Sequence, residues 1–287
     1  MVTRIIERFS KIWDCYDTYL VDQWGVLHNG YKAYHSAVEV MWKLREKGKS
    51  LVILSNSSRR EHTTRHNMKS ISIDDNLFER VVTSGEEVWQ ALHKRSEPFY
   101  TGLGTRCVVF QWGQDNDFFE GLDLEVVRNV EDAEFILLNG TEKDKNSEYE
   151  EVLREGVERS LPLVCSNGDF VSMTPDGKLV NCPGKVARRY ESLGGRVKWH
   201  GKPTLGAYRM ALEGVASDAR VLAIGDSLYH DIGGANAAGV DSLFISSGIH
   251  RLEINKGTDH LLNLEILHRL YVQYGGTPTY VLRQLIW

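Results

Sequence analysis

Apolar residues occur in short blocks that end in polar residues. Residues 19–22 read YLVD, residues 51–55 read LVILS and residues 221–226 read VLAIGD. Short runs rich in Val, Ile and Leu predict buried strands. Each strand carries its polar residue at the carboxyl end, the edge of an α/β sheet where ligands bind. A single Asp there usually only caps a turn, so several such residues together are needed to indicate a site.

The segment between the first two blocks is predicted to be a helix. Its apolar residues follow the spacing of one helix face, and Gly48 ends it, the face residues being Ala37, Val40, Met41 and Leu44. Consecutive strand, helix and strand form a right-handed unit with parallel strands. Residues 204–246 repeat this alternation. The pattern predicts an α/β fold whose core is a doubly wound, Rossmann-like parallel sheet.

A second, smaller α/β unit is predicted inside the first. Residues 98–105 are rich in turn formers and mark a boundary. Strands are expected at 106–111, 134–139 and 163–166, with helices at about 115–121, 147–160 and 185–193, and residues 196–200 are expected to return the chain to the first sheet. The predicted domains are core 1–100, inserted domain 101–195 and core 196–287.

The two ends of the chain are predicted to be amphipathic. Residues 1–13 mix basic residues with Glu7 and apolar residues, which favours an opening helix over a signal peptide. Leucine and isoleucine between residues 261 and 270 predict a helix, and residues 277–287 are expected to pack as a final amphipathic element.

Composition excludes several classes of function. The 34 basic and 39 acidic residues give a net charge of −5 without a basic block, so neither nucleic acid nor a membrane surface is an expected partner. No apolar run is long enough for a membrane helix. The four cysteines lack metal-ligand or disulfide spacing, which fits a reducing cytoplasm. A homodimer is one expected assembly.

Four motifs lie in order along the chain: Asp22 in DQWGV, Ser55 in SNSSR, Lys202 in GKP, and Asp226 with Asp231 in GDSLYHD. Together they resemble the motifs of the haloacid dehalogenase superfamily, and they are most similar to its branch of nagD-type and 4-nitrophenyl phosphatases. The resemblance covers nearly the whole chain. It implies that the inserted domain is a C2-type cap able to close over the sheet edge.

The resemblance also implies a phosphatase mechanism. Asp22 would be the nucleophile that forms an aspartyl-phosphate, Ser55 would donate to a phosphate oxygen, and Lys202 would hold both by charge. Mg²⁺ is the implied cofactor, bound by Asp22, the Trp24 carbonyl and Asp226, with Asp231 as a further ligand or as support for one. Taken singly, these residues could equally be helix caps and solvated turn residues.

The implied substrate is a small phosphorylated metabolite. Ser55, Asn56, Lys202 and Trp24 are its candidate contacts in the core. The cap loops offer Asn167, Asp169 and residues 181–184. Trp24 could stack on a substrate ring, although packing between core and cap is the more common role of such a residue.

Trp24 is the one departure from the family pattern. Phosphatases of the superfamily carry a second Asp there, which protonates the leaving oxygen and then activates water, and an indole N–H cannot shuttle a proton. Another group could take over, with His28 and His230 nearest in sequence. The substrate could instead have a good leaving group, or the protein could be a non-catalytic, regulatory binder of a phosphorylated ligand.

Two rival motifs are weaker. Residues 225–228 spell GDSL, which in GDSL esterases would make Ser227 an acyl-transfer nucleophile. In those enzymes the block lies near the chain start and a late Asp-x-x-His pair follows, which this chain lacks. Gly102 and Gly104 suggest a dinucleotide fingerprint, yet they precede a strand and lack the third glycine.

Overall fold

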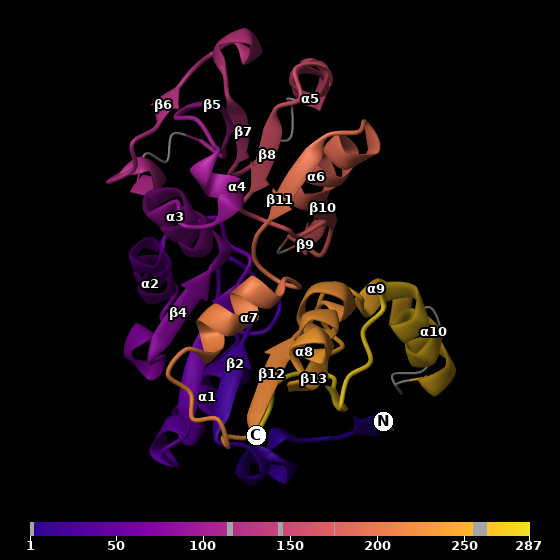
Figure 1. Cartoon of the computed structure of the whole chain (residues 1–287). Helices are drawn as coiled ribbons and strands as arrows, with labels where there is room; N and C mark the ends of the chain where they lie inside the picture. Colours follow the sequence, from indigo (N-terminus) through magenta and orange to yellow (C-terminus); the bar gives the residue numbers. More distant parts are fainter. Residues whose placement is uncertain (1–2, 114–116, 143–145, 175, 255–262) are drawn as a thin grey trace.

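The computed structural model describes residues 3–113, 117–142, 146–174, 176–254 and 263–287, and it contains two parallel sheets (Figure 1). The larger sheet has the order β1-β14-β13-β12-β2-β3-β4. Its strands are β1 (Arg4–Ile5), β2 (Thr18–Val21), β3 (Ser50–Ser55), β4 (Arg80–Thr83), β12 (Val221–Gly225), β13 (Asp241–Ile245) and β14 (Tyr280–Leu282). This is the doubly wound sheet that the sequence predicts.

The smaller sheet lies above the larger one in Figure 1 and has the order β11-β8-β7-β5-β6. Its strands are β5 (Arg106–Phe110), β6 (Glu125–Val126), β7 (Phe135–Leu138), β8 (Pro162–Cys165) and β11 (Arg196–Trp199). A separate antiparallel hairpin, β9 (Val171–Met173) with β10 (Leu179–Asn181), joins this part of the chain. We call the part built on the smaller sheet the cap and the rest the core.

Helices cover both faces of the larger sheet. These are α1 (His35–Glu46), α2 (Glu61–Ser70), α7 (Leu205–Leu212), α8 (Gly233–Ala238) and α10 (Leu264–Tyr274). Helix α3 (Ser84–Lys94) follows β4, and its buried Val88 and Leu92 pack with strands of the smaller sheet. Strand β2 is buried on both sides: Tyr19 and Val21 pack in the cluster that contains α1, and Leu20 packs in the cluster that contains α7 and α8. Such two-sided burial is why its sequence is a continuous apolar run.

The remaining helices are short or belong to the cap. The cap contains α5 (Asn146–Glu158) and α6 (Pro183–Ser192), and α4 (Pro98–Thr101) lies at its entrance. A π-helix, η6 (Leu228–Ile232), leads into α8, and α9 (Arg251–Ile254) follows β13. None of the helices in the described ranges is long and apolar enough to cross a membrane.

Several predicted elements are wrong. The opening segment is not an amphipathic helix: β1 pairs with β14, and 3₁₀ turns follow at Phe9–Lys11 and Trp13–Cys15. Residues 196–199 do not return to the first sheet, because β11 pairs with β8 in the cap. Short strands such as these carry too few residues for alternation to identify their partner.

Three further elements differ in detail. The final segment contributes β14 to the larger sheet. The helix expected at 115–121 is a single 3₁₀ turn, Asp117–Phe119, within the described residues. The tail helix begins at Leu264, and the expected start at 261 and 262 lies outside the described residues.

Candidate active site

The carboxyl ends of three neighbouring core strands bring the predicted residues together. Asp22 follows β2, Ser55 is the last residue of β3, and Asp226 follows β12. The register pairs Val21 with both Ile53 and Ile224, so Asp22 lies one residue beyond the paired level and Ser55 and Asp226 lie two residues beyond it, all at the same end of the sheet. The ends of parallel strands meet at one sheet edge, which explains why sequence blocks far apart in the chain converge here.

Lys202 lies at the centre of the site. Its Nζ is 2.7 Å from Asp22 Oδ1 and 2.6 Å from Asp231 Oδ1, and all three side chains are buried. Burial alone would lower the pKa of Lys202, but the charges of Asp22 and Asp231 outweigh it and the pKa is raised. The lysine is therefore a permanent cation between two carboxylates.

Three buried carboxylates form a candidate metal site. Ligand oxygens of Asp22, Asp226 and Asp231 lie within 4.8 Å of one another. Asp226 Oδ2 accepts from the Ile249 N–H at 3.0 Å, and Asp231 Oδ2 accepts from the Ser227 N–H at 2.9 Å, so two of them are oriented by backbone. Hard oxygen ligands of this kind suit Mg²⁺.

The three buried carboxylates repel one another, and a bound cation would offset this repulsion. Burial raises the pKa of Asp22 to about 7; Asp231 adds to the rise and Lys202 opposes it. Burial raises the pKa of Asp226 as well, with the charges of Asp22 and Asp231 adding to it. Glycine is required beside Asp226, because a Cβ on Gly25 or Gly248 would lie 2.0 Å from its Oδ2.

Trp24 points from the core to the cap. Its Nε1–H donates to the carbonyl of Met173 in β9 at 2.9 Å, while its ring packs over Gly30 and edge-on to His28. Its side chain lines the cavity described below and the residue is 39% exposed. The geometry fits the expected packing between core and cap. Its predicted roles as a metal ligand through the carbonyl and as a stacking surface stay predictions.

Both the oxygen and the nitrogen of the Asn56 side-chain amide form hydrogen bonds within the protein. Its Oδ1 accepts from the Lys202 N–H at 2.7 Å, and its Nδ2 donates to the Lys202 carbonyl at 3.0 Å and to Asp169 Oδ1 at 2.8 Å. Asn56 therefore joins the lysine turn to a cap loop. Ser55 is also buried, and its Oγ accepts a long bond of 3.3 Å from the Ser57 N–H.

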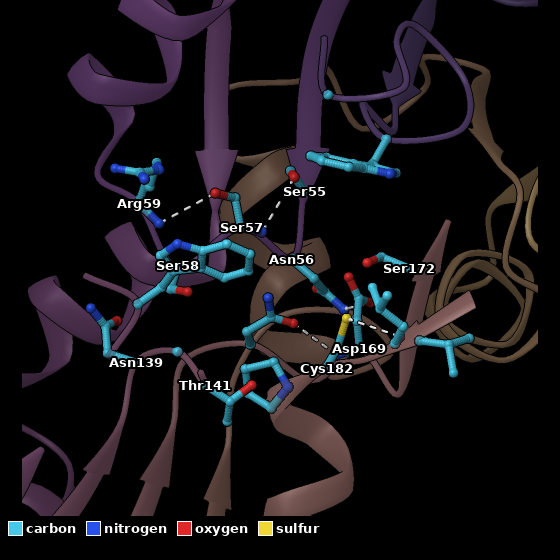
Figure 2. Close-up of a pocket in the computed structure, with 18 of the residues that line it drawn as sticks. Ser55, Asn56, Ser57, Ser58, Arg59, Asn139, Thr141, Asp169, Ser172 and Cys182 are labelled. Carbon is cyan, nitrogen blue, oxygen red and sulfur yellow. Dashed lines mark hydrogen bonds between the residues drawn. The ribbon is translucent and has the colours of Figure 1, made fainter. Parts of the chain in front are cut away.

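Core and cap enclose a cavity of about 800 Å³. Figure 2 shows Ser55 to Arg59 on its core side, with Asn139, Thr141, Asp169 and Cys182 on its cap side. Asn167, Asn181 and Pro183 also line it, so the structure brings the predicted cap loops to the core site. Asn167 Oδ1 accepts from the Asp169 N–H at 2.9 Å and shapes that loop.

Sequence reasoning missed the cap residues that follow β5 and β7. Gln111, Trp112, Asn139 and Thr141 line the cavity. They are polar or aromatic residues directly after apolar strands, which is the same signal that located Asp22. Because the cap sheet is parallel, its carboxyl edge gathers these side chains just as the core sheet does.

Neither histidine near the site is free to move a proton. His28 Nδ1 accepts from the Gly30 N–H at 3.0 Å, and burial lowers the pKa of His28 to about 4, so its Nε2 carries the hydrogen. His230 Nε2 donates to the Gly168 carbonyl at 3.0 Å, and its Nδ1 lies 3.0 Å from Ser227 Oγ. Burial also lowers the pKa of His230.

Ser227 acts as a helix cap in this structure. Its Oγ accepts from the His230 N–H at 3.1 Å at the start of η6. This geometry gives the GDSL block a structural role. The glycines at 102 and 104 precede β5, as the sequence indicates, and do not open a helix.

Comparison with known proteins supports the family that the motifs indicate. The model of haloacid dehalogenase-like hydrolases matches residues 19–125, and a HAD-hydrolase-like model matches residues 199–267. A curated relative, 5'-nucleotidase YutF of Bacillus subtilis, is 23% identical over 248 residues, which cover 83% of this chain and 90% of that protein.

Solved structures agree with this. A haloacid dehalogenase-like hydrolase from Brucella suis is 28% identical with a TM-score of 0.82 and covers 98% of this chain and 100% of its own. A 4-nitrophenylphosphatase from Thermotoga maritima is 21% identical with a TM-score of 0.69, covering 95% and 96%. A glycerol phosphate phosphatase from Mycobacterium tuberculosis, solved with magnesium, is 22% identical with a TM-score of 0.64, covering 86% and 74%.

The chain belongs to the haloacid dehalogenase superfamily. Its fold is the α/β fold of that superfamily with a cap, and its relatives are phosphatases of the HAD type.

Proposed function

We propose that this protein is a Mg²⁺-dependent phosphatase that acts on a small phosphorylated metabolite through an aspartyl-phosphate at Asp22. The observation that carries the proposal is the convergence of Asp22, Asp226 and Asp231 within 4.8 Å, with Lys202 bridging two of them. A nucleophile, a cation site and a fixed positive charge are the parts that phosphoryl transfer requires.

Each residue has a role in this proposal. An Asp22 oxygen attacks phosphorus and the bond to the leaving oxygen breaks. Lys202 orients Asp22 and offsets negative charge on the transferring group, and Ser55 donates to a phosphate oxygen. Asp22, Asp226, the Trp24 carbonyl and Asp231 would hold Mg²⁺, which supplies charge neutralisation when bound. The M. tuberculosis neighbour solved with magnesium supports this choice of metal.

Trp24 defines the kind of substrate. No acid is present at position 24 to protonate a departing alkoxide, and general acid catalysis is typically worth about 10²–10⁴ in rate. The leaving groups of aryl and acyl phosphates depart without that help. The cavity of about 800 Å³ holds a metabolite-sized ligand. The name of the B. subtilis relative adds a nucleoside 5'-phosphate to the substrates worth testing.

The second candidate is a non-catalytic protein that binds a phosphorylated ligand on the same fold. The absence of an acid at position 24 is the observation that favours it. A cytoplasmic location, a homodimer and the absence of nucleic-acid or membrane partners stay predictions.

The test is a paired assay with and without Mg²⁺. We expect 4-nitrophenyl phosphate to be hydrolysed while a sugar phosphate and a nucleoside 5'-phosphate react slowly, because only the aryl group leaves unaided. Trp24→Asp should raise the two slow rates by about 10²-fold, since it restores an acid.

Trp24→Phe serves as the control, because it changes the ring without adding an acid and should leave the slow rates low. No turnover of any substrate by either wild type or Trp24→Asp would refute the hydrolase. In that case, saturable binding of phosphate would establish the second candidate, a non-catalytic protein that binds a phosphorylated ligand.

A further inference from the structure

Release of phosphate from Asp22 needs a base that activates water, and Trp24 cannot supply one. In an in-line displacement the attacking water lies opposite the bond that breaks. The phosphoryl group on Asp22 would therefore be attacked from the side away from the core strands. That side is the cavity under the cap, so a base supplied by the cap lies on the correct face.

Asp169 is a cap carboxylate in that position. It follows β8 and lines the cavity together with Asp22 and Lys202. Its Oδ1 accepts from Asn56 Nδ2 at 2.8 Å, and the same Nδ2 donates to the Lys202 carbonyl at 3.0 Å. Its charge acts on both Asp22 and Lys202. The side chain is 34% exposed, so water can reach it.

Other groups of the cavity that could accept a proton already have partners, Glu142 among them. Both rings, His28 and His230, have fixed hydrogen bonds on the nitrogen that would have to accept a proton. On the cap side, Asp117 binds His62 and Thr63, and Glu150 binds Arg189 in a two-pronged ion pair. Among the described residues, the Asp169 carboxylate accepts its side-chain hydrogen bond from neutral Asn56, and His230 Nδ1 lies 3.6 Å from the same Oδ1, beyond hydrogen-bond distance.

We propose that Asp169 is the general base of the second half of the reaction, the hydrolysis of the aspartyl-phosphate. The water oxygen bonds to phosphorus, the bond between phosphorus and the Asp22 oxygen breaks, and the water proton passes to the Asp169 carboxylate and then to solvent. This inference rests on the proposed function. The two roles of the missing Asp at position 24 are then filled separately. The substrate has a leaving group that needs no protonation, and the cap supplies the base that activates water.

The experiment is rapid-mixing kinetics of Asp169→Asn with 4-nitrophenyl phosphate and Mg²⁺. The amide oxygen can still accept from Asn56, so the variant removes the base and keeps the hydrogen bond. We expect a burst of one equivalent of 4-nitrophenolate, a steady rate lowered about 10²-fold or more, and a phosphorylated protein in intact mass spectra. Wild type should accumulate little phosphoprotein.

Two controls sharpen this result. Asp123→Asn changes an exposed cap carboxylate outside the cavity and should behave as wild type. Trp24→Asp combined with Asp169→Asn should regain steady turnover, because it restores a base on the core side. If Asp169→Asn folds poorly, Asp169→Ala gives the same readout, and added acetate should restore its slow step.

Wild-type steady turnover in Asp169→Asn would overturn the inference. So would loss of the burst together with the steady rate, because Asp169 would then act on binding or on the first step. If wild type itself gives neither nitrophenolate nor phosphoprotein, the proposed function fails, and the inference fails with it.

Discussion

His28 shows how one buried side chain makes stability depend on pH. Burial lowers its pKa to about 4 in the folded protein, while an exposed histidine titrates near about 6.5. Between these values the unfolded chain binds a proton that the folded chain does not. Stability is therefore fully present above about pH 6.5 and falls as the pH drops toward 4.

We predict that His28→Asn removes this part of the acid sensitivity. The asparagine oxygen can accept from the Gly30 N–H as His28 Nδ1 does. Between pH 7 and 4.5 wild type should lose about 2–3 kcal/mol more of its unfolding free energy than the variant. Urea denaturation at both pH values measures this. Equal losses in the two proteins would show that His28 is not responsible.

The turn that carries Lys202 is an element held from two sides. Asn56 binds the backbone of Lys202 in both directions. Glu87 in α3 accepts from the Gly201 N–H at 2.8 Å through Oε2, and its Oε1 lies 3.2 Å from His200 Nδ1. His200 Nε2 in turn hydrogen-bonds the hydroxyl of Tyr100 in α4.

We predict that Glu87→Ala destabilises the protein and misplaces the lysine. The Gly201 N–H loses a charged acceptor, and a bond of this kind contributes about 1.5–3 kcal/mol. Urea denaturation should show a loss of that size, together with a lower kcat on 4-nitrophenyl phosphate. Glu87→Gln keeps an acceptor oxygen and should lose less in both measurements. Similar losses in the two variants would contradict a role in holding the turn.

The elements divide into those that the sequence predicts and those that it does not. Strands such as β2 and β3 are buried on both faces, so their apolar runs identify them, and their carboxyl ends predict that Asp22 and Ser55 meet. Strand β1 is only two exposed residues at the sheet edge, and its pairing with β14 is decided by contacts across the whole chain. Local pattern carries no such information.

The same division holds for the site. Asp22, Lys202, Asp226 and Asp231 follow core elements whose order is predictable, and the structure brings them together. The contact between Asn56 and Asp169 depends on how the cap sits on the core, which spacing along the chain does not encode. The role of Glu87 likewise depends on the packing of α3 against the lysine turn.

For the whole molecule, the central question is what holds the cap over the core. Polar contacts cross the boundary at several points: Trp24 donates to Met173, His230 donates to Gly168, and Arg251 donates to the Gly177 carbonyl at 3.2 Å. Two of them reach the β9–β10 hairpin and its turn. These contacts are single hydrogen bonds, so each contributes only about 0.5–1.5 kcal/mol, and the hairpin side of the cap can open to admit a substrate. On the other side, Val88 and Leu92 of α3 pack in one apolar cluster with strands of the cap.

We predict that Trp24→Phe loosens the hairpin without disturbing the core. Phenylalanine keeps an aromatic ring over Gly30 but removes the N–H that donates to Met173. The closed state should lose about 1 kcal/mol of stability. Amides of β9 and β10 that exchange through cap opening should therefore exchange about fivefold faster. Mass spectrometry of peptic fragments measures this. Trp42→Phe, a change at an exposed tryptophan of α1, is the matched control and should leave the hairpin unaffected. Unchanged exchange at β9 and β10 in Trp24→Phe would mean that the cap stays closed by its other contacts alone.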